Sequence, residues 1–228
     1  MKNRKILTLF VLSLLLPLMI SGCAAYRSEL QMAYTGEVRR NAETAPVSVL
    51  FIFSHIKQME GWDAIPKIES KYERLRSFDD IFLESKNELS NLGRYSTYLE
   101  EASDISDLKK RDMRDSLMKV MDYTVKFRIE TKSSFAKYFF SGFISSVTLS
   151  LVPASYTKHY TVKAEVLNRN NELLSSYERK ADVSNWYQMF LMFVYPFHPE
   201  IRKVEEVHLD FLKDIFRQME SEGVLKKY

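Results

Sequence analysis

The feature that most constrains this fold is a series of strand patterns in the middle of the 228-residue chain. Apolar and polar side chains alternate over residues 123–131, and the same alternation returns over 158–167. Residues 168–171 are turn-forming, and a third strand is expected over about 172–182. Period-two alternation is typical of strands with one buried face. The pattern therefore predicts an antiparallel meander whose first and third strands run in the same direction.

The flanking sequence predicts helices and further strands. Residues 47–53 are dense in β-branched and aromatic side chains, which indicates a buried strand, and residues 94–101 read as a short one. Helices are expected over about 63–75, from Ser77 to Gly93, from Ser103 onward, and from Pro199 to Gly223. This order predicts an α+β (mixed α/β) fold. Helices would pack on one face of a mixed sheet that ends in an antiparallel meander, with an apolar insertion between strands.

The N-terminus has the pattern of an export signal. A basic start at residues 2–5 precedes an uncharged apolar run over 6–20. That run contains Pro17 and is shorter than the roughly 20 residues of a spanning helix. The small residues Ser21 and Gly22 stand before Cys23, which is the single cysteine of the chain. An ordinary secretory signal that happens to contain a cysteine is the alternative interpretation.

Residues 20–23, Ile-Ser-Gly-Cys, resemble the lipobox of bacterial lipoproteins. The resemblance implies cleavage between Gly22 and Cys23, a diacylglyceryl thioether on the Cys23 sulfur, and acylation of its freed amine, for instance with palmitate. Ala24 in the following position implies an outer-membrane anchor that faces the periplasm. The expected organisation is a signal peptide at 1–22, a lipidated tether at 23–45 and a single α/β domain at 46–228.

Charge and motif content exclude several classes of function. Lys2, Arg4 and Lys5 are the only charged residues in the expected signal peptide, so its removal takes the formal net charge from +3 to zero. A neutral chain has no electrostatic footprint for nucleic acid. No phosphate loop, dinucleotide fingerprint, nucleophile elbow or metal-binding motif is present, and the pair Glu205 and His208 lacks the second helix of a di-iron site. We therefore expect no cofactor, metal, small-molecule substrate or catalytic residue.

Two uncharged stretches, 138–157 and 183–197, are the unusual feature of the predicted domain. Because both leave the meander from the same end, we expect them to lie at one pole. They allow three interpretations: buried core, an exposed patch for a partner or the membrane, or a spanning element. Since a lipid anchor would already hold the membrane, we expect this pole to pack internally or to meet a partner. The candidate contact residues are Phe140, Phe143, Ile144, Val147, Trp186, Phe190 and Phe193.

The order of elements over about residues 46–223 is similar to the N-terminal domain of TolB and to curli-secretion-type outer-membrane lipoproteins. That resemblance implies a protein that binds partners or assembles, and not an enzyme. We expect a non-enzymatic, lipid-anchored envelope lipoprotein, an outer-membrane assembly or maintenance accessory that binds a protein partner or the membrane surface. The alternatives are a homo-oligomeric secretion or pore-forming component, and an enzyme with an unrecognised site.

Overall fold

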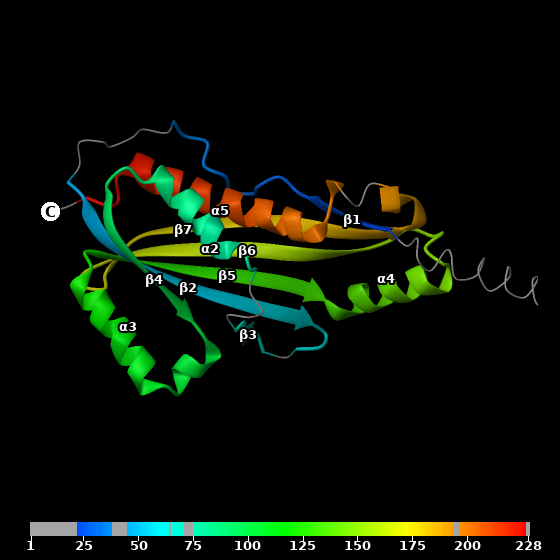
Figure 1. Cartoon of the computed structure of the whole chain (residues 1–228), viewed down its shortest axis with the longest axis horizontal. Coiled ribbons are helices and arrows are strands. Elements are labelled where there is room, and N and C mark those ends of the chain that lie inside the picture. Colours follow the sequence, from blue (N-terminus) through cyan, green and yellow to red (C-terminus); the bar gives the residue numbers. More distant parts are fainter. Residues whose placement is uncertain (1–21, 38–44, 64, 71–74, 194–196, 227–228) are drawn as a thin grey trace, which may run out of the picture.

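The computed structural model describes residues 22–37, 45–63, 65–70, 75–193 and 197–226. In this part of the chain a seven-stranded mixed sheet is combined with four α-helices, which confirms the predicted α+β class (Figure 1). The predicted signal peptide up to residue 21 lies outside the described residues. The strands are β1 (Gly22–Arg27), β2 (Val47–Glu60), β3 (Lys67–Ile68), β4 (Leu92–Glu100), β5 (Tyr123–Ser134), β6 (Ala154–Asn168) and β7 (Leu173–Gln188). The helices are α2 (Phe78–Ser85), α3 (Leu108–Val120), α4 (Phe135–Val147) and α5 (Glu200–Glu222).

The meander is confirmed, and it is longer than the sequence pattern indicates. The sheet order is β1-β7-β6-β5-β2-β3, with β4 also paired to β2. Strands β5, β6 and β7 are successively antiparallel, so Phe127 is opposite Ala164, which is opposite Tyr177. Strand β2 runs parallel to both β4 and β5. In β5, the four apolar side chains of the alternating pattern, at positions 123, 125, 127 and 129, are buried.

The core lies between the sheet and helices α2 and α5. Aromatic rings from β2, β5 and both helices meet there. Between ring centroids, Phe51 lies 5.0 Å from Phe82 and 5.7 Å from Phe216, and Phe53 lies 5.2 Å from Phe127. Edge-to-face and offset aromatic pairs add to the free energy gained by burying these rings. Replacing any one of them with alanine is expected to cost about 3–5 kcal/mol.

Helix α3 differs from the predicted plan, because it packs on the opposite face of the sheet. Leu50 and Ile52 of β2 meet Met121, Leu117 and Met118 there. Strand β2 is thus covered on both faces, which explains why residues 47–53 form a nearly continuous apolar run and not an alternating one. The end of α5 is as predicted, since Gly223 has φ +60° and the Val224 N–H donates to the Met219 carbonyl at 3.3 Å.

The prediction of a tether at 23–45 is wrong for its first half. Residues 22–27 form strand β1, which pairs with β7 at the edge of the sheet. The chain then continues along β7, with the Ser28 N–H donating to the Asp182 carbonyl and the Gln31 N–H to the Lys180 carbonyl, each at 2.8 Å. The pairing with β7 holds this segment extended, and Ala24 and Ala25 are buried there. Residues 38–44 lie outside the described part.

Three other predicted elements are also corrected. No helix occupies 63–75 in its described residues, because β2 extends to Glu60, Gly61 turns the chain at φ +84°, and Lys67–Ile68 pairs back on β2. Position 72 lies outside the described residues. Helix α2 ends at Ser85. The helix expected from Ser103 onward is present as α3 but begins later, at Leu108, where the side chain of Asp107 caps it; Ala102–Ile105 is a separate 3-10 turn. The first residues of the second uncharged stretch, 183–188, belong to β7.

Candidate functional site

Helix α4 is inverted relative to an ordinary surface helix. Two of its three serines face the protein: Ser141 is 4% exposed, and the Ser145 hydroxyl lies 2.8 Å from that of Ser150. Its large apolar residues face outward, with exposures between 39% and 66%. They are Tyr138, Phe139, Phe140, Phe143, Ile144 and Val147. A surface helix normally turns its apolar stripe toward the core. The interpretation of residues 138–157 as buried core is therefore wrong for this helix.

The hydroxyl groups of α4 are satisfied within the helix itself. Ser141 donates to the Tyr138 carbonyl at 2.9 Å, Ser146 to the Gly142 carbonyl at 2.8 Å, and Thr148 to the Ile144 carbonyl at 2.7 Å. This back-bonding removes the need for water at these side chains. Lys137 is the one charged residue of the helix. The helix therefore presents a long surface that needs little hydration.

The second uncharged stretch joins the first, as predicted. The Met189 N–H donates to the Ser150 carbonyl at 2.9 Å, which ties the end of β7 to the loop after α4. Trp186 is 39% exposed and Phe190, in the 3-10 turn η4 (Met189–Phe193), is 63% exposed. The side chain of Phe193 lies outside the described residues. Residues 151, 152 and 197 add three more exposed apolar side chains.

Sequence reasoning missed one residue of this surface, Trp62. It stands in the turn after β2, is 70% exposed, and its ring lies 4.8 Å from that of Phe135 at the start of α4. Both tryptophans of the chain therefore lie at this end of the sheet. The sequence signal for it is a tryptophan next to the turn residue Gly61. Its position beside α4 depends on the length of β2, which extends to Glu60.

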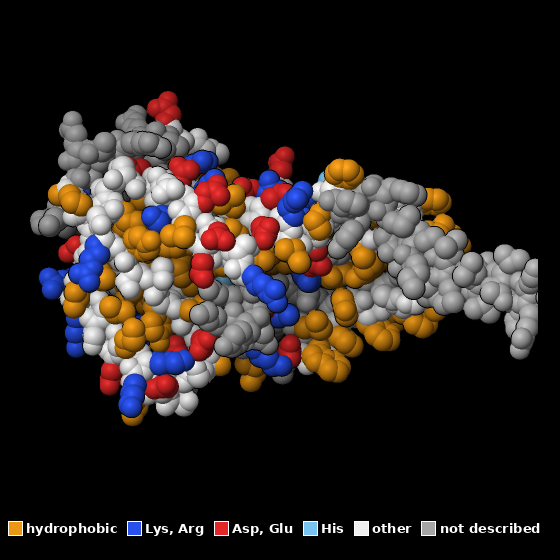
Figure 2. Space-filling model, in the orientation of Figure 1, with side chains coloured by type: hydrophobic (Ala, Val, Ile, Leu, Met, Phe, Trp, Pro, Cys, Tyr) orange, Lys and Arg blue, Asp and Glu red, His pale blue; other side chains and the backbone are white. Residues whose placement is uncertain are grey.

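We call this surface the apolar pole and define it by Trp62, residues 138–152, Trp186, Phe190 and Phe197. Figure 2 shows hydrophobic side chains gathered around α4, whereas the charged side chains lie mostly over the other end of the molecule. An apolar surface of this continuity marks an interaction site more often than chance exposure. Among the described helices, none combines the length and the apolar character needed to cross a membrane.

Cys23, the predicted lipidation site, lies in β1 at this same end of the sheet. Its Cα is paired with that of Tyr187, and Gly22 is paired with Gln188, the last residue of β7. The thiol is half-buried. Desolvation, and secondarily the charge of Glu200, raise the pKa of Cys23. Cys23 and the apolar pole are therefore held together by sheet hydrogen bonds and are not separated by a tether.

A cleft of about 710 Å³ opens on the face of the sheet that α5 covers, beyond the first turn of that helix. Its floor comes from the ends of β2, β5 and β6, and its walls from α5, from Tyr138 of α4 and from the segment around Glu69. The T-shaped pair Tyr138 and Tyr156, with centroids 5.2 Å apart, joins the cleft to the apolar pole. Sequence reasoning missed the cleft, because its residues come from five separated segments.

The pair Glu205 and His208, which the sequence offers for a metal site, has structural contacts. Glu205 accepts a hydrogen bond from Ser77 at 2.5 Å, and the His208 ring nitrogen lies 2.8 Å from the Val204 carbonyl. Desolvation lowers the pKa of His208, which keeps its imidazole neutral. Within the described ranges, no group of three or more His, Cys, Asp or Glu side chains is arranged to hold a metal ion.

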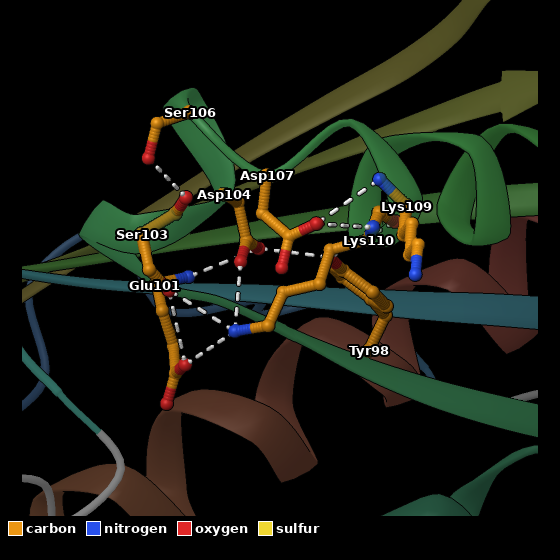
Figure 3. Close-up of polar contacts among 8 residues, drawn as sticks. All are labelled: Tyr98, Glu101, Ser103, Asp104, Ser106, Asp107, Lys109 and Lys110. Atoms are coloured by element: carbon orange, nitrogen blue, oxygen red, sulfur yellow. Dashed lines mark hydrogen bonds and ion pairs between the residues drawn. The ribbon is translucent and has the colours of Figure 1, made fainter.

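A polar network around Asp104 fixes the turn before α3 (Figure 3). Its carboxylate accepts from the Tyr98 hydroxyl at 2.8 Å and from the Glu101 N–H at 3.2 Å, and it pairs with Lys110 at 3.3 Å. Desolvation alone would raise the pKa of Asp104, but these donors together lower it. Desolvation and the same carboxylate raise the pKa of Tyr98 to about 12. The network caps and anchors the turn, which is a structural role.

No protein-family model matches the chain, and no curated protein sequence matches it. Solved structures similar to it include two of the PelC dodecamer from Paraburkholderia phytofirmans. Each of the two is 8% identical in sequence and matches 86% of this chain. The match to a variant covers 98% of the PelC chain with a TM-score of 0.29, and the second match covers 97% of the PelC chain with a TM-score of 0.31. A homolog of the neuraminyllactose-binding hemagglutinin from Helicobacter pylori shows 8% identity and a TM-score of 0.29, over 63% of this chain and 67% of that one.

Proposed function

We propose that this chain is a non-enzymatic, lipid-anchored envelope lipoprotein whose apolar pole lies in the interface of the membrane that holds it. The observation that carries the proposal is the inverted helix α4, which buries Ser141 and turns its large apolar residues outward. In water this arrangement exposes apolar surface that a folded protein normally buries. In a membrane interface the same side chains gain free energy, and tryptophan and tyrosine are the residues favoured there.

The dimensions support a helix that lies in the interface and does not cross it. The 13 residues of α4 span about 20 Å at 1.5 Å per residue, which is short of the roughly 30 Å hydrocarbon core. Helices that lie in the plane of the interface bury one apolar face to a depth of about 5–10 Å. The outward face of α4 has the composition for this contact.

The position of Cys23 supports the same orientation. A lipid on this residue would start at the edge of the sheet, one strand away from Tyr187, so it would bring the apolar pole against the bilayer. The lipid and the pole would then act as two membrane signals on one rigid body, which is the arrangement that gives stable anchoring. The sequence-based expectation that the pole avoids the membrane is replaced by this proposal.

Two measurements test the proposal. Intact-mass spectrometry of the full chain purified from bacterial envelopes is expected to show loss of residues 1–22 and addition of lipid, and Cys23→Ala should abolish both. Flotation of residues 24–228 with phosphatidylethanolamine vesicles containing a minor fraction of phosphatidylglycerol tests the pole without the lipid. We expect binding that the double variant Phe140→Ser/Phe190→Ser loses.

The matched control is Leu108→Ser/Val120→Ser, which removes two comparably exposed apolar side chains from α3 at the other end of the sheet. This control should bind vesicles as the parent does. If residues 24–228 stay in solution with vesicles but form concentration-dependent oligomers that the Phe140 and Phe190 changes disrupt, the pole is a self-association surface. That result would replace the membrane proposal with the homo-oligomeric alternative.

A further inference from the structure

The cleft beside α5 shares Tyr138 with the apolar pole, so it adjoins the surface that is proposed to contact the bilayer. We infer that it takes one acyl chain of a membrane phospholipid, with the zwitterionic headgroup at the charged rim. This inference rests on the proposed function, because it needs the pole to face the membrane. Its volume of about 710 Å³ falls in the range of small-molecule sites, which is roughly 300–1,000 Å³.

The interior of the cleft suits a hydrocarbon chain. The floor carries Ile129 and Tyr160, both almost fully buried, and the wall carries Val204 and Leu75. His208 lies at the inner end, where desolvation lowers its pKa and keeps it uncharged. An acyl chain laid along these side chains would meet apolar surface and the uncharged imidazole of His208. The cleft is therefore a place where apolar contact, and not ion pairing, provides the binding free energy.

The rim of the cleft suits a headgroup with both charges. Lys158 pairs with Glu200 at 2.6 Å, and Lys57 lies 4.0 Å from Glu69. Arg76 is an exposed cation at the same rim, and Glu205 adds a carboxylate, so the lining holds three cations and three anions. A phosphate can approach Arg76 and Lys57 while an ammonium group approaches a carboxylate. This balance favours phosphatidylethanolamine over a purely anionic lipid.

Aromatic rings connect the apolar pole to the cleft. Tyr138 belongs to the exposed face of α4 and also lines the cleft. Its ring contacts Tyr156, whose ring lies 5.9 Å from that of Tyr187. A chain leaving the bilayer at the apolar pole would therefore pass over aromatic rings on its way to the cleft. This continuity distinguishes a bilayer lipid from a water-borne ligand as the occupant.

Photolabelling tests the inference in the full chain. The protein is reconstituted in phosphatidylethanolamine vesicles that contain a minor fraction of phosphatidylethanolamine with a diazirine in one acyl chain and an alkyne tag. After irradiation, mass spectrometry of tagged peptides locates the label. We expect label on peptides containing Thr131 and Tyr160, as well as on α4.

Substitutions that fill or charge the cleft should remove the label on the cleft peptides and leave the label on α4. Thr131→Trp and Ile201→Asp are expected to lower cleft labelling about tenfold, the effect of losing roughly one side-chain contact. Because Ile201 is 68% exposed, its replacement tests the cleft even if Thr131→Trp disturbs folding. Thr161→Trp makes the same substitution on the opposite face of the sheet and should change nothing.

The outcomes separate this inference from the proposed function. Label on α4 with none in the cleft would overturn the acyl-chain inference and leave the membrane-facing pole intact. Absence of label from both would refute the proposed function itself. If the cleft is labelled only after Cys23→Ala, the protein's own lipid fills it, and a bilayer phospholipid is not the occupant. A probe with a phosphatidylglycerol headgroup that labels the cleft more strongly would overturn the assignment of a zwitterionic ligand.

Discussion

Replacing Arg179 with methionine is expected to lower the free energy of unfolding by about 3 kcal/mol. Arg179 lies on the inner face of β7 and is 4% exposed. Its guanidinium donates to Asp214 and to Gln218 of α5, each at 2.5 Å, and to the Glu178 carbonyl at 2.8 Å. The Asp214 carboxylate also accepts the Tyr34 N–H at 3.0 Å. The network thus joins three segments: β7, α5 and the chain that follows β1.

The magnitude follows from what the substitution leaves behind. Methionine fills much of the space of arginine, so the cost of a cavity is small. Asp214, with its side chain 16% exposed, loses its cation but keeps the hydrogen bond from Tyr34. Breaking a buried ion pair by removing one partner costs about 3–5 kcal/mol, and the residual exposure of Asp214 places the effect at the lower end. Against a typical stability of roughly 5–15 kcal/mol, this is a large loss.

Urea unfolding of residues 24–228, followed by far-UV circular dichroism, measures the effect. Lys180→Met is the matched control, since Lys180 is the exposed neighbour on the outer face and its pair with Glu178 should contribute less than about 1 kcal/mol. The double variant Arg179→Met/Asp214→Leu should lose less than the sum of the two single variants. A loss below about 1 kcal/mol for Arg179→Met, or strict additivity in the cycle, would refute the reasoning.

Three further results are expected. Gly223→Ala should lower the thermal midpoint through a loss of about 1 kcal/mol, because alanine is strained at φ +60°, and an unchanged midpoint would contradict this helix ending. Phe143→Ser, at a side chain 56% exposed, should change unfolding by less than about 0.5 kcal/mol but weaken vesicle binding about tenfold. A large loss of stability with unchanged vesicle binding would instead place the Phe143 side chain in the hydrophobic core. Since the pKa of Asp104 is lowered by folding, the stability advantage over Asp104→Asn should be present above pH ~4 and vanish as pH falls through that lowered pKa. A pH-independent difference in urea midpoint would show that the charge is not involved.

The elements predicted correctly are those whose alternation of apolar and polar residues results from packing on one face only. Strands β5, β6 and β7 alternate because one face meets α5 and the other is largely open, and α5 ends where Gly223 allows a left-handed residue. The shared position of the two uncharged stretches followed from strand direction alone. Each of these inferences uses local periodicity or simple connectivity, and both are present in a single sequence.

The elements predicted wrongly depend on contacts between distant segments. The far half of β2 contains Lys57 and Gln58 and reads as polar, but twelve successive pairings with β5 keep it extended. Strand β1 is short, and only β7 makes it a strand. The cleft is assembled from five segments, so no sequence window contains it. Long-range pairing overrides local propensity in each case.

Helix α4 shows why periodicity finds the two faces of a helix but does not tell which one faces the protein. Its phase is fixed where β5 passes directly into the helix at Ser134, and this buries Ser141 and leaves Phe143 exposed. The usual rule, that the apolar face turns inward, assumes that water surrounds the protein. The proposed membrane contact reverses this assumption for α4, because the surroundings of its outward apolar face would then not be water. Cys23 was interpreted from the sequence as an anchor independent of the fold. Its place in β1 makes it part of that same pole, so the lipid and the helix predict one orientation, and moving either without the other should weaken membrane binding.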